Sequence, residues 1–363
     1  MRVFHVITTI ERGGAEKQLL ILVREQIALG YEVEIIYLKG KPELEPDFLE
    51  SGATVNNLLV GKNFLLQIQL LKNYGKGKQG IFHAHLPRAE LFTALSLKKS
   101  VYFVSRHNSE SFMPGFPGLF SSFLSRYVTR HSAGVVAISQ AVKDYILKSN
   151  EISKKSEVEV ILYGAAKVQD NQIQSYSRSQ FGISDSDYVI GTIGRLAPQK
   201  DYPTLLNAFQ ILRTSCPNAK LIIVGGGPEE AKLKEFAYQL GLQESILWLG
   251  RVKNVEALMK VFDVFVLTSI YEGFGLVFLE AMTQDVPIVA TNHSSVPEVL
   301  GPSYPLLSEV GDSQDIARKL TLLQDEELRN QIRGMLNTRI ALFDSAVMAK
   351  KIDSLYAKIS IEQ

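Results

Sequence analysis

Residues Ser269 to Met282 read SIYEGFGLVFLEAM, a segment with two carboxylates eight positions apart, Glu272 and Glu280. The apolar run Val264 to Leu267 before it has the length of a buried parallel strand. After it, the apolar pattern from Val277 predicts a helix. Glu272 is therefore expected on a strand-to-helix turn, and Glu280 about one turn inside the helix. Such a unit indicates an α/β fold with a parallel sheet.

The turn between the two carboxylates favours close approach of a ligand. Gly273 and Gly275 lack side chains, and the amides of Gly275, Leu276 and Val277 point outward at the helix start. Carboxylates accept hydrogen bonds from sugar hydroxyls, and free amides suit phosphate or hydroxyl oxygens. A glutamate near a helix start more often only compensates the helix dipole, so the interpretation depends on other segments. A nucleotide-linked sugar would offer both kinds of group.

A second strand-to-helix turn carries two cations. Tyr188 to Gly194 reads as a strand that ends at glycine and runs into Arg195, and Lys200 follows five residues later. Apolar spacing in Asp201 to Ser215 predicts a one-sided helix, so both cations occupy its entry loop. Arginine offers a planar fork and lysine a mobile point charge, and together they match a diphosphate.

A third glycine loop lies near the beginning of the chain. Arg2 to Ile7 reads as a strand, and Gly13 and Gly14 precede a helix over roughly Ala15 to Leu29. The Gly-x-Gly-x-x-Gly fingerprint is missing, and no acid after the next strand is placed to hold a ribose, which disfavours a nicotinamide enzyme. Bare amides at a helix start still let a phosphate or sugar oxygen come close.

These loops, together with the Gly225-Gly226-Gly227-Pro228 turn, resemble the retaining glycosyltransferases of the GT-B fold, specifically family 4, the group 1 glycosyltransferases. The resemblance runs in order along nearly the whole chain. It implies two Rossmann-like α/β domains with parallel sheets that face each other across a cleft. The C-terminal domain would hold a nucleoside-diphosphate-sugar, with a UDP-sugar as the first expectation, and the N-terminal domain a hydroxyl acceptor. No metal or other cofactor is implied.

The alternation of strands and helices divides the chain in the same way. We expect an acceptor-binding domain over residues 1–165 and a donor-binding domain over residues 166–345, with a closing helix at 346–363 that crosses back onto the first. Strands are predicted near residues 2, 32, 81, 101, 134 and 158, and then near 188, 220, 246, 264 and 286.

The resemblance also implies residue roles. Arg195 and Lys200 would bind the donor diphosphate, Glu272 the sugar, and Glu280 the ribose hydroxyls. The residues expected to act in catalysis are His107, Arg195, Lys200 and Glu272. The residues expected to bind the donor are Gly13, Gly14, Gly194, Arg195, Lys200, Gly225, Glu272, Gly273, Phe274, Gly275, Leu276 and Glu280.

Histidines cluster in the first half of the chain. His107 follows a strand that starts at Val101, and the resemblance places it near the reacting carbon, although a capped loop histidine is the structural alternative. His83 and His85 are two apart on a strand and share one face. That geometry could hold a metal, but no third ligand is evident and zinc usually has three or four. We expect His83 to be structural. The residues expected to line the acceptor cleft are His85, Arg88 and Arg106.

The chain departs from the family pattern at three places. Tyr163-Gly164-Ala165-Ala166 replaces Asn-Gly-x-Asp at the junction of the domains, and Asp201 follows Lys200 where glycine is usual. Residues 301–305 replace a glycine-rich turn. These changes affect the expected hinge and the sugar selectivity.

Composition agrees with an ordered protein of two domains. The chain has 363 residues, of which 46% are hydrophobic and 21% charged. A single cysteine, Cys216, allows no internal disulfide and suits a reducing cytosol. No signal peptide or membrane-spanning stretch is evident, so we expect a cytoplasmic protein, either free or peripheral on the inner face of the cytoplasmic membrane of a bacterium.

Net positive charge is concentrated in the first half of the chain. Residues 1–165 carry 20 basic and 15 acidic side chains. The stretch from Lys62 to Lys143 carries 11 basic and 2 acidic side chains. Phe112 to Arg130 adds aromatic residues among the basic ones. Two interpretations remain open, docking on an anionic membrane and an ordinary core helix with a solvated basic face. Nucleic acid is disfavoured because no recognition module is present.

The sequence therefore predicts a retaining hexosyltransferase that moves a sugar from a nucleoside-diphosphate-sugar to a hydroxyl acceptor, with a lipid-linked glycan or a cell-envelope polysaccharide precursor expected as that acceptor. The nearer alternative is another GT-B activity, a phosphorylase or a nucleotide-sugar epimerase. The more distant one is a non-catalytic partner protein that kept the fold.

Overall fold

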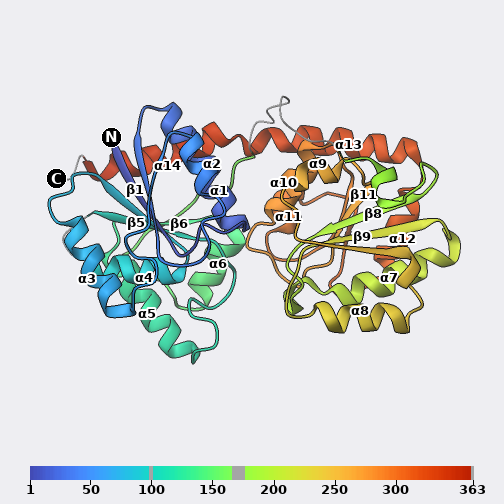
Figure 1. Cartoon of the computed structure of the whole chain (residues 1–363), viewed down its shortest axis with the longest axis horizontal. Helices are drawn as coiled ribbons and strands as arrows, with labels where there is room; N and C mark the ends of the chain where they lie inside the picture. Colours follow the sequence, from blue (N-terminus) through green and yellow to red (C-terminus); the bar gives the residue numbers. More distant parts are fainter. Residues whose placement is uncertain (98–100, 166–175, 361–363) are drawn as a thin grey trace. The chain divides into compact units, whose positions relative to one another are not determined.

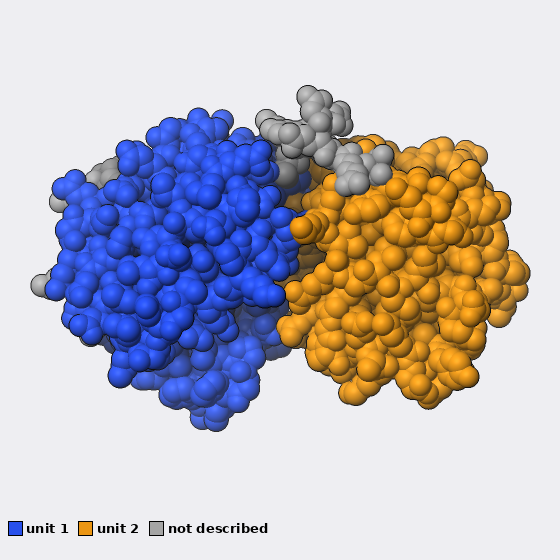
Figure 2. All heavy atoms as spheres, in the orientation of Figure 1, with its two compact units in different colours: residues 1–166, 343–363 blue, residues 167–342 orange. Residues whose placement is uncertain are grey.

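The computed structural model describes residues 1–97, 101–165 and 176–360. The chain forms two compact units, which Figure 2 distinguishes by colour. The first comprises Met1–Ala166 together with Phe343–Gln363, and the second comprises Lys167–Leu342. None of the described helices is both long and apolar enough to cross a lipid bilayer.

The first unit is built on a parallel sheet of seven strands, in the order β3-β2-β1-β4-β5-β6-β7. Figure 1 labels β1, β5 and β6 of this sheet. Its central strands are buried on both faces, which explains their nearly continuous apolar sequences. The order reverses between β1 and β4, so the carboxyl ends of these two strands mark a point where ligands commonly bind. The strands are β1 (Arg2–Ile7), β2 (Glu32–Tyr37), β3 (Thr54–Asn56), β4 (Ile81–His85), β5 (Tyr102–Arg106), β6 (Gly134–Ala137) and β7 (Val158–Val160).

Helices cover both faces of this sheet. The last helix of the chain packs against the first one, and Met348, Ile352 and Tyr356 from it are buried in the same core as Leu19 and Val23. The C-terminal helix thus belongs to the first unit, although its residues follow the second unit in sequence. The helices are α1 (Gly14–Ala28), α2 (Glu45–Glu50), α3 (Phe64–Gly75), α4 (Pro87–Ser96), α5 (Gly118–His131), α6 (Gln140–Lys148) and α14 (Ser345–Ser360).

The second unit has a parallel sheet of six strands, in the order β10-β9-β8-β11-β12-β13. Here the order reverses between β8 and β11. The strands are β8 (Tyr188–Ile193), β9 (Ala219–Val224), β10 (Ile246–Gly250), β11 (Val264–Leu267), β12 (Ile288–Thr291) and β13 (Leu307–Ser308). The α-helices are α7 (Tyr202–Ser215), α8 (Glu230–Gln239), α9 (Val255–Met259), α10 (Leu276–Thr283), α11 (Val296–Leu300), α12 (Ser313–Leu322) and α13 (Glu326–Ile340).

The sequence missed two strands, β3 and β13. They are three and two residues long, and each lies at an edge of its sheet. So short a segment contains too few residues to show an apolar pattern. The predicted domain boundary after residue 165 adjoins residues 166–175, which lie outside the described residues. The predicted closing helix includes residues 361–363, which also lie outside them.

Candidate functional site

Two predicted donor residues of the second unit form a buried ion pair. Lys200 Nζ lies 2.5 Å from Glu272 Oε1, and the two side chains are only 14% and 7% exposed. Ser269 Oγ donates to the same carboxylate oxygen at 2.5 Å. Lys200 follows β8 and Glu272 follows β11, so the pair lies at the carboxyl ends of the two strands between which the sheet order reverses.

Hydrogen bonds between the two loops explain why these residues meet. Thr268 Oγ1 donates to the carbonyl oxygens of Lys200 and Asp201, both at 3.0 Å. Ile270 N donates to Gln199 O at 2.8 Å, and Gln199 Nε2 donates to Tyr271 O at 2.9 Å. These hydrogen bonds therefore fix the loop after β8, which carries Lys200, against the loop after β11, which carries Glu272.

Asp201 occupies a position where backbone geometry favours glycine. Its φ is 45°, in the left-handed region, which aspartate tolerates better than most side chains. Its Oδ2 accepts a 2.6 Å hydrogen bond from Thr204 Oγ1 at the start of α7. Asp201, which stands where the family usually has glycine, therefore adopts a left-handed turn and also accepts a local hydrogen bond.

The predicted glycines of the second unit lie at loop contacts. A Cβ on Gly225 would lie 1.9 Å from Gly194 O, and Gly225 has a φ of 135°. A Cβ on Gly275, the residue before α10, would lie 2.6 Å from the Phe278 ring. Close packing of the protein itself thus accounts for these two glycines.

The remaining donor residues of this unit lie near the same sheet edge. Arg195 is exposed directly after Gly194, and Glu280 is half-buried on α10. Phe274 is buried, so its backbone rather than its ring would be offered to a ligand. Gly273 and Leu276 flank the start of α10 and are partly exposed.

The glycine loop of the first unit carries a buried carboxylate. Gly13 precedes α1 without a side-chain cap, and a Cβ on Gly13 would lie 2.4 Å from Glu16 Oε2. Glu16 Oε1 accepts a 2.6 Å hydrogen bond from Thr9 Oγ1, and burial raises the pKa of this carboxyl. An ionised Glu16 carboxylate would repel a phosphate beside Gly13 and Gly14. It would instead accept a hydrogen bond from a ligand hydroxyl.

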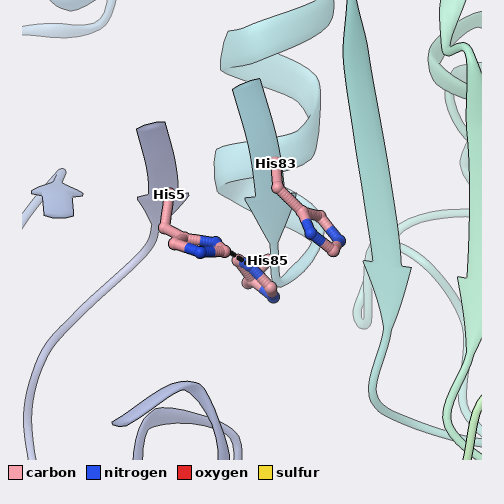
Figure 3. Close-up of side chains that lie close together, drawn as sticks. All are labelled: His5, His83 and His85. Carbon is pink, nitrogen blue, oxygen red and sulfur yellow. Dashed lines mark hydrogen bonds between the residues drawn. The ribbon is translucent and has the colours of Figure 1, made fainter. Parts of the chain in front are cut away.

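Three buried histidines lie together on one face of the first sheet (Figure 3). His5 on β1 is the register partner of His83 on β4, and their candidate ligand atoms and those of His85 lie within 4.8 Å of one another. His5 is thus a third potential ligand beside His83 and His85, one that is not evident from the sequence. Sequence alone could not show this, because the contact depends on β1 pairing with β4.

Hydrogen bonds already occupy the nitrogens of this cluster. His83 Nδ1 is 2.5 Å from Tyr356 Oη, and His83 Nε2 is 2.7 Å from Ser105 Oγ. His5 contacts His85 at 2.9 Å and Gln26 at 2.7 Å. Burial lowers the pKa of all three imidazoles, so they are uncharged. This arrangement favours a hydrogen-bonded core over a cation site.

His107 extends the same network. Its Nε2 lies 3.2 Å from His85 Nδ1, and its Nδ1 contacts the Tyr163 hydroxyl. Burial, with a further contribution from the charge of Arg106, lowers the pKa of His107 to about 3. Both ring nitrogens are therefore used inside the unit, and His107 is neither an exposed loop residue nor a charged group.

Arg106 does not line a cleft, contrary to the prediction. Its side chain is 4% exposed, with Nε 2.9 Å from Glu90 Oε2 and Nη1 3.6 Å from Glu151 Oε2. Its guanidinium also lies 4.4 Å from the centre of the Phe112 ring. An arginine this deeply buried needs such partners, so its role is structural.

The two other residues predicted for the acceptor cleft, His85 and Arg88, differ in burial. His85 is buried, and with His107 and Tyr163 it lines a cavity of about 20 Å³, the room of roughly one water molecule. Arg88 is half-buried at the start of α4, with its guanidinium 5.4 Å from the Phe92 ring centre. Arg88 lies beyond the carboxyl end of β4, where the first sheet reverses its order.

Two family models match this chain, one in each half. A model described as "Glycosyltransferase Family 4" matches residues 12–164, and one described as "Glycosyl transferases group 1" matches residues 173–334. The chain belongs to the group 1 glycosyltransferases. The predicted family is confirmed, and so is the predicted pair of Rossmann-like domains of the GT-B fold, because this glycosyltransferase has GT-B structural neighbours.

Individual relatives agree with this family. The glycosyltransferase is 30% identical over 64% of its length to N-acetyl-alpha-D-glucosaminyl L-malate synthase of Bacillus anthracis. It is 26% identical over 95% of its length to an N-acetylgalactosaminyltransferase of Campylobacter jejuni that acts on a diphospho-undecaprenol glycan, and the match covers 96% of that enzyme. The chain spans about three fifths of the Bacillus enzyme and of a Staphylococcus aureus capsular polysaccharide glycosyltransferase.

Solved structures show the same fold. The Anabaena protein HepE in complex with UDP and glucose superposes with a TM-score of 0.83, covers 98% of this chain and 99% of its own, and is 18% identical. At that identity the likeness establishes the fold and not the ligand.

Proposed function

We propose that this glycosyltransferase moves a hexose from a nucleoside-diphosphate-sugar to a hydroxyl acceptor with retention of configuration. The observation that carries the proposal is the Lys200–Glu272 pair at the reversal point of the second sheet. One site there offers a cation for a phosphate oxygen and a carboxylate for sugar hydroxyls. A UDP-sugar is the proposed donor, supported by the UDP-glucose complex of the structural neighbour HepE.

Transfer would depend on stabilising the leaving group. As the anomeric carbon–oxygen bond breaks, its electron pair goes to the diphosphate, and Lys200, Arg195 and the amides before α10 would stabilise that charge. The acceptor oxygen would bond to the anomeric carbon on the same face, and its proton would pass to the departing phosphate oxygen. These cationic and amide groups can stabilise the leaving group without a metal ion or a further cofactor.

The ion pair suggests how donor binding begins. Glu272 pairs with Lys200 and holds its ammonium group in place. A donor diphosphate would then replace the carboxylate as the partner of Lys200, and Glu272 would become available to the sugar hydroxyls. Because the lysine is already placed, little side-chain entropy would be lost on binding.

For the acceptor, we propose a lipid-linked glycan or a cell-envelope polysaccharide precursor. This rests on the names of the relatives, which include the undecaprenol-dependent Campylobacter enzyme and the capsular polysaccharide enzyme of Staphylococcus aureus. Such an acceptor lies at a membrane surface, which raises the question of how the protein reaches it.

Helix α5 offers an apolar surface for this purpose. Its buried side chains are mostly small and polar: Ser121 and Ser125 are fully buried, and Ser125 Oγ donates to Glu151 O at 2.6 Å. Leu119, Phe120 and Phe123 on this helix are exposed instead. The α5 apolar face, as named here, consists of Leu119, Phe120 and Phe123 on the helix and Phe116 just before it, which are 89%, 46%, 59% and 53% exposed. This exposure supports the docking interpretation of the segment over that of an ordinary core helix.

We propose that an anionic membrane covers the α5 apolar face. Basic residues dominate the surrounding sequence, with 11 basic and 2 acidic side chains from Lys62 to Lys143. Arg126 and Arg130 lie on the same helix, and Arg130 is exposed. The Lys98-Lys99 pair lies outside the described residues. Each basic side chain near an anionic leaflet adds about 1 kcal/mol, so several hold a protein there reversibly.

Product analysis tests the proposed reaction. The purified protein is incubated with UDP-sugars, with and without a polyprenol-linked acceptor, and the anomeric configuration of the product is read by NMR. Transfer with a retained α-linkage is expected. Release of a sugar 1-phosphate from a glycan would instead indicate a phosphorylase, a donor epimer without acceptor an epimerase, and no donor turnover at all a non-catalytic protein.

A further inference from the structure

A continuous chain of hydrogen bonds runs through the core of the first unit and ends at His107. The links join side chains from α1, β1, β4, the residue after β5 and the segment after β7. In order they are Gln26 Oε1 to His5 Nε2 at 2.7 Å, His5 Nδ1 to His85 Nε2 at 2.9 Å, His85 Nδ1 to His107 Nε2 at 3.2 Å, and His107 Nδ1 to Tyr163 Oη.

The donor direction of this chain follows from its inner end. The oxygen of Gln26 can only accept, so His5 Nε2 carries a proton and His5 Nδ1 does not. His85 must then donate from Nε2 to His5, and His107 from Nε2 to His85. Tyr163 supplies the last proton, to His107 Nδ1. Four links require four donors, and three uncharged imidazoles with one phenol supply four.

This chain cannot carry a proton through the core. A proton that entered at Tyr163 would have to leave at Gln26, and an amide oxygen is too weakly basic to take it. The surroundings also disfavour a charged ring, because the network is buried and Arg106 lies beside His107. The chain therefore fixes tautomers rather than conducting protons.

We propose that Tyr163 and His85 are positioning residues that hold His107 as the uncharged Nε2–H tautomer, so that His107 serves the reaction as a fixed hydrogen-bond acceptor at Nδ1. This rests on the proposed sugar transfer. A carbohydrate hydroxyl would replace the Tyr163 hydroxyl at Nδ1, the one ring position where exchange leaves the other histidine links intact. The cavity of about 20 Å³ lined by His85, His107 and Tyr163 lies at this point.

The tautomers are tested directly in the full chain with ¹⁵N-labelled histidine. Long-range ¹H–¹⁵N correlations at pH 7 are expected to show His5, His85 and His107 uncharged and protonated at Nε2. A charged ring or an Nδ1–H tautomer at His107 would overturn the proposal. This readout needs no turnover, so an inactive protein would refute the proposed function and leave the tautomer result standing.

A pair of tyrosine variants tests the effect on transfer. Tyr163→Phe is expected to lower kcat at least tenfold and to change the His107 resonances, with UDP affinity changed less than twofold. Tyr356→Phe is the matched control, since it removes the same hydroxyl from His83 Nδ1, outside the chain. Its kcat should stay within twofold of the parent. Equal loss of kcat in both variants, or unchanged kcat in Tyr163→Phe, would contradict the proposal.

Gln26 provides a second test should Tyr163→Phe fold poorly. Gln26→Glu keeps an acceptor oxygen for His5 Nε2, whereas Gln26→Leu removes it. We expect the Nε2–H tautomers to persist in the first variant and to become mixed in the second, with a parallel fall in kcat only in the second. Mixed tautomers without a fall in kcat would refute the positioning role.

Discussion

Lys200 and Glu272 are 72 residues apart, yet they share one hydrogen bond in the second unit. The resemblance to the family places them on different parts of the donor, Lys200 on the diphosphate and Glu272 on the sugar. A substitution of either residue therefore also removes one hydrogen-bond partner from the other, at a site where both side chains are largely shielded from solvent. The two assigned roles can therefore be separated only by measuring binding and turnover together.

Lys200→Ala should reduce kcat while the protein stays folded. Loss of one group that stabilises a leaving anion costs roughly 10²- to 10³-fold in rate. Steady-state transfer assays with circular dichroism of the variant make the measurement. Lys232→Ala is the control, because Lys232 also pairs with a glutamate, Glu229, but on the exposed surface of α8. Near-normal turnover in Lys200→Ala would refute the leaving-group role.

Asp201 gives a prediction about stability. Asp201→Gly should be more stable than Asp201→Ala by about 1 kcal/mol, because alanine in the left-handed region strains its Cβ and glycine does not. Both variants lose the hydrogen bond to Thr204, so the difference isolates the backbone. Urea unfolding measures the free energies. Equal stabilities would show that the left-handed turn is absent in solution.

At the scale of elements, α5 and α14 show what an amphipathic pattern leaves undecided. The apolar residues of α5 gave a recognisable stripe, but the Ser121 and Ser125 face is the one that the first unit buries. In α14, by contrast, the apolar residues Ile352 and Tyr356 enter the core as expected. A pattern indicates which residues share a face, and only the neighbouring elements decide which face is covered.

The double variant Leu119→Glu with Phe123→Glu should lose binding to vesicles that contain anionic phospholipid. Both residues are exposed, so the fold should be unaffected, and transfer to a water-soluble acceptor should continue. Co-sedimentation measures binding. Leu147→Glu on α6, also in the first unit and 51% exposed, is the control and should still bind. Undiminished sedimentation of the double variant would rule out the α5 apolar face as the docking surface.

Gly164→Ala should destabilise the contact between the end of the first sheet and α14. The new Cβ would lie 2.4 Å from Ser345 Cα, a backbone atom that cannot move alone. Overpacking of this kind costs about 1–3 kcal/mol. The comparison is Gly334→Ala on α13, where a Cβ meets no atom within 4 Å. If chemical unfolding showed equal effects for the two variants, the close approach at Gly164 would be disproved.

At the scale of the whole molecule, the two units have separate sheets and cores, and the predicted nucleotide contacts lie mostly in the second. The family motifs follow this division, since one family model ends at residue 164 and the other begins at residue 173. Donor binding should thus stabilise the second unit directly.

UDP should raise the thermal stability of the protein, and Glu280→Ala should reduce that effect. At a concentration of UDP one hundred times its Kd, binding adds about 2.7 kcal/mol. Differential scanning calorimetry detects the shift, and isothermal titration measures the weaker affinity of the variant. Glu235→Ala, on a surface helix of the same unit, should behave as the parent. An unchanged affinity of Glu280→Ala for UDP would contradict the assignment of Glu280 to the ribose hydroxyls.

The sequence by itself determined the family, the two series of parallel strands and the glycine loops that lead into α1, α7 and α10. These features are local, because a strand-to-helix turn and its glycines lie within a few residues of one another. Tertiary structure alone decided that His5 joins His85, 80 positions away, that Arg106 pairs with Glu90 and Glu151, and that α5 turns its apolar side outward. Those contacts depend on the order of strands in the sheet and on which helix covers it. Neither can be predicted from the residues of one short segment.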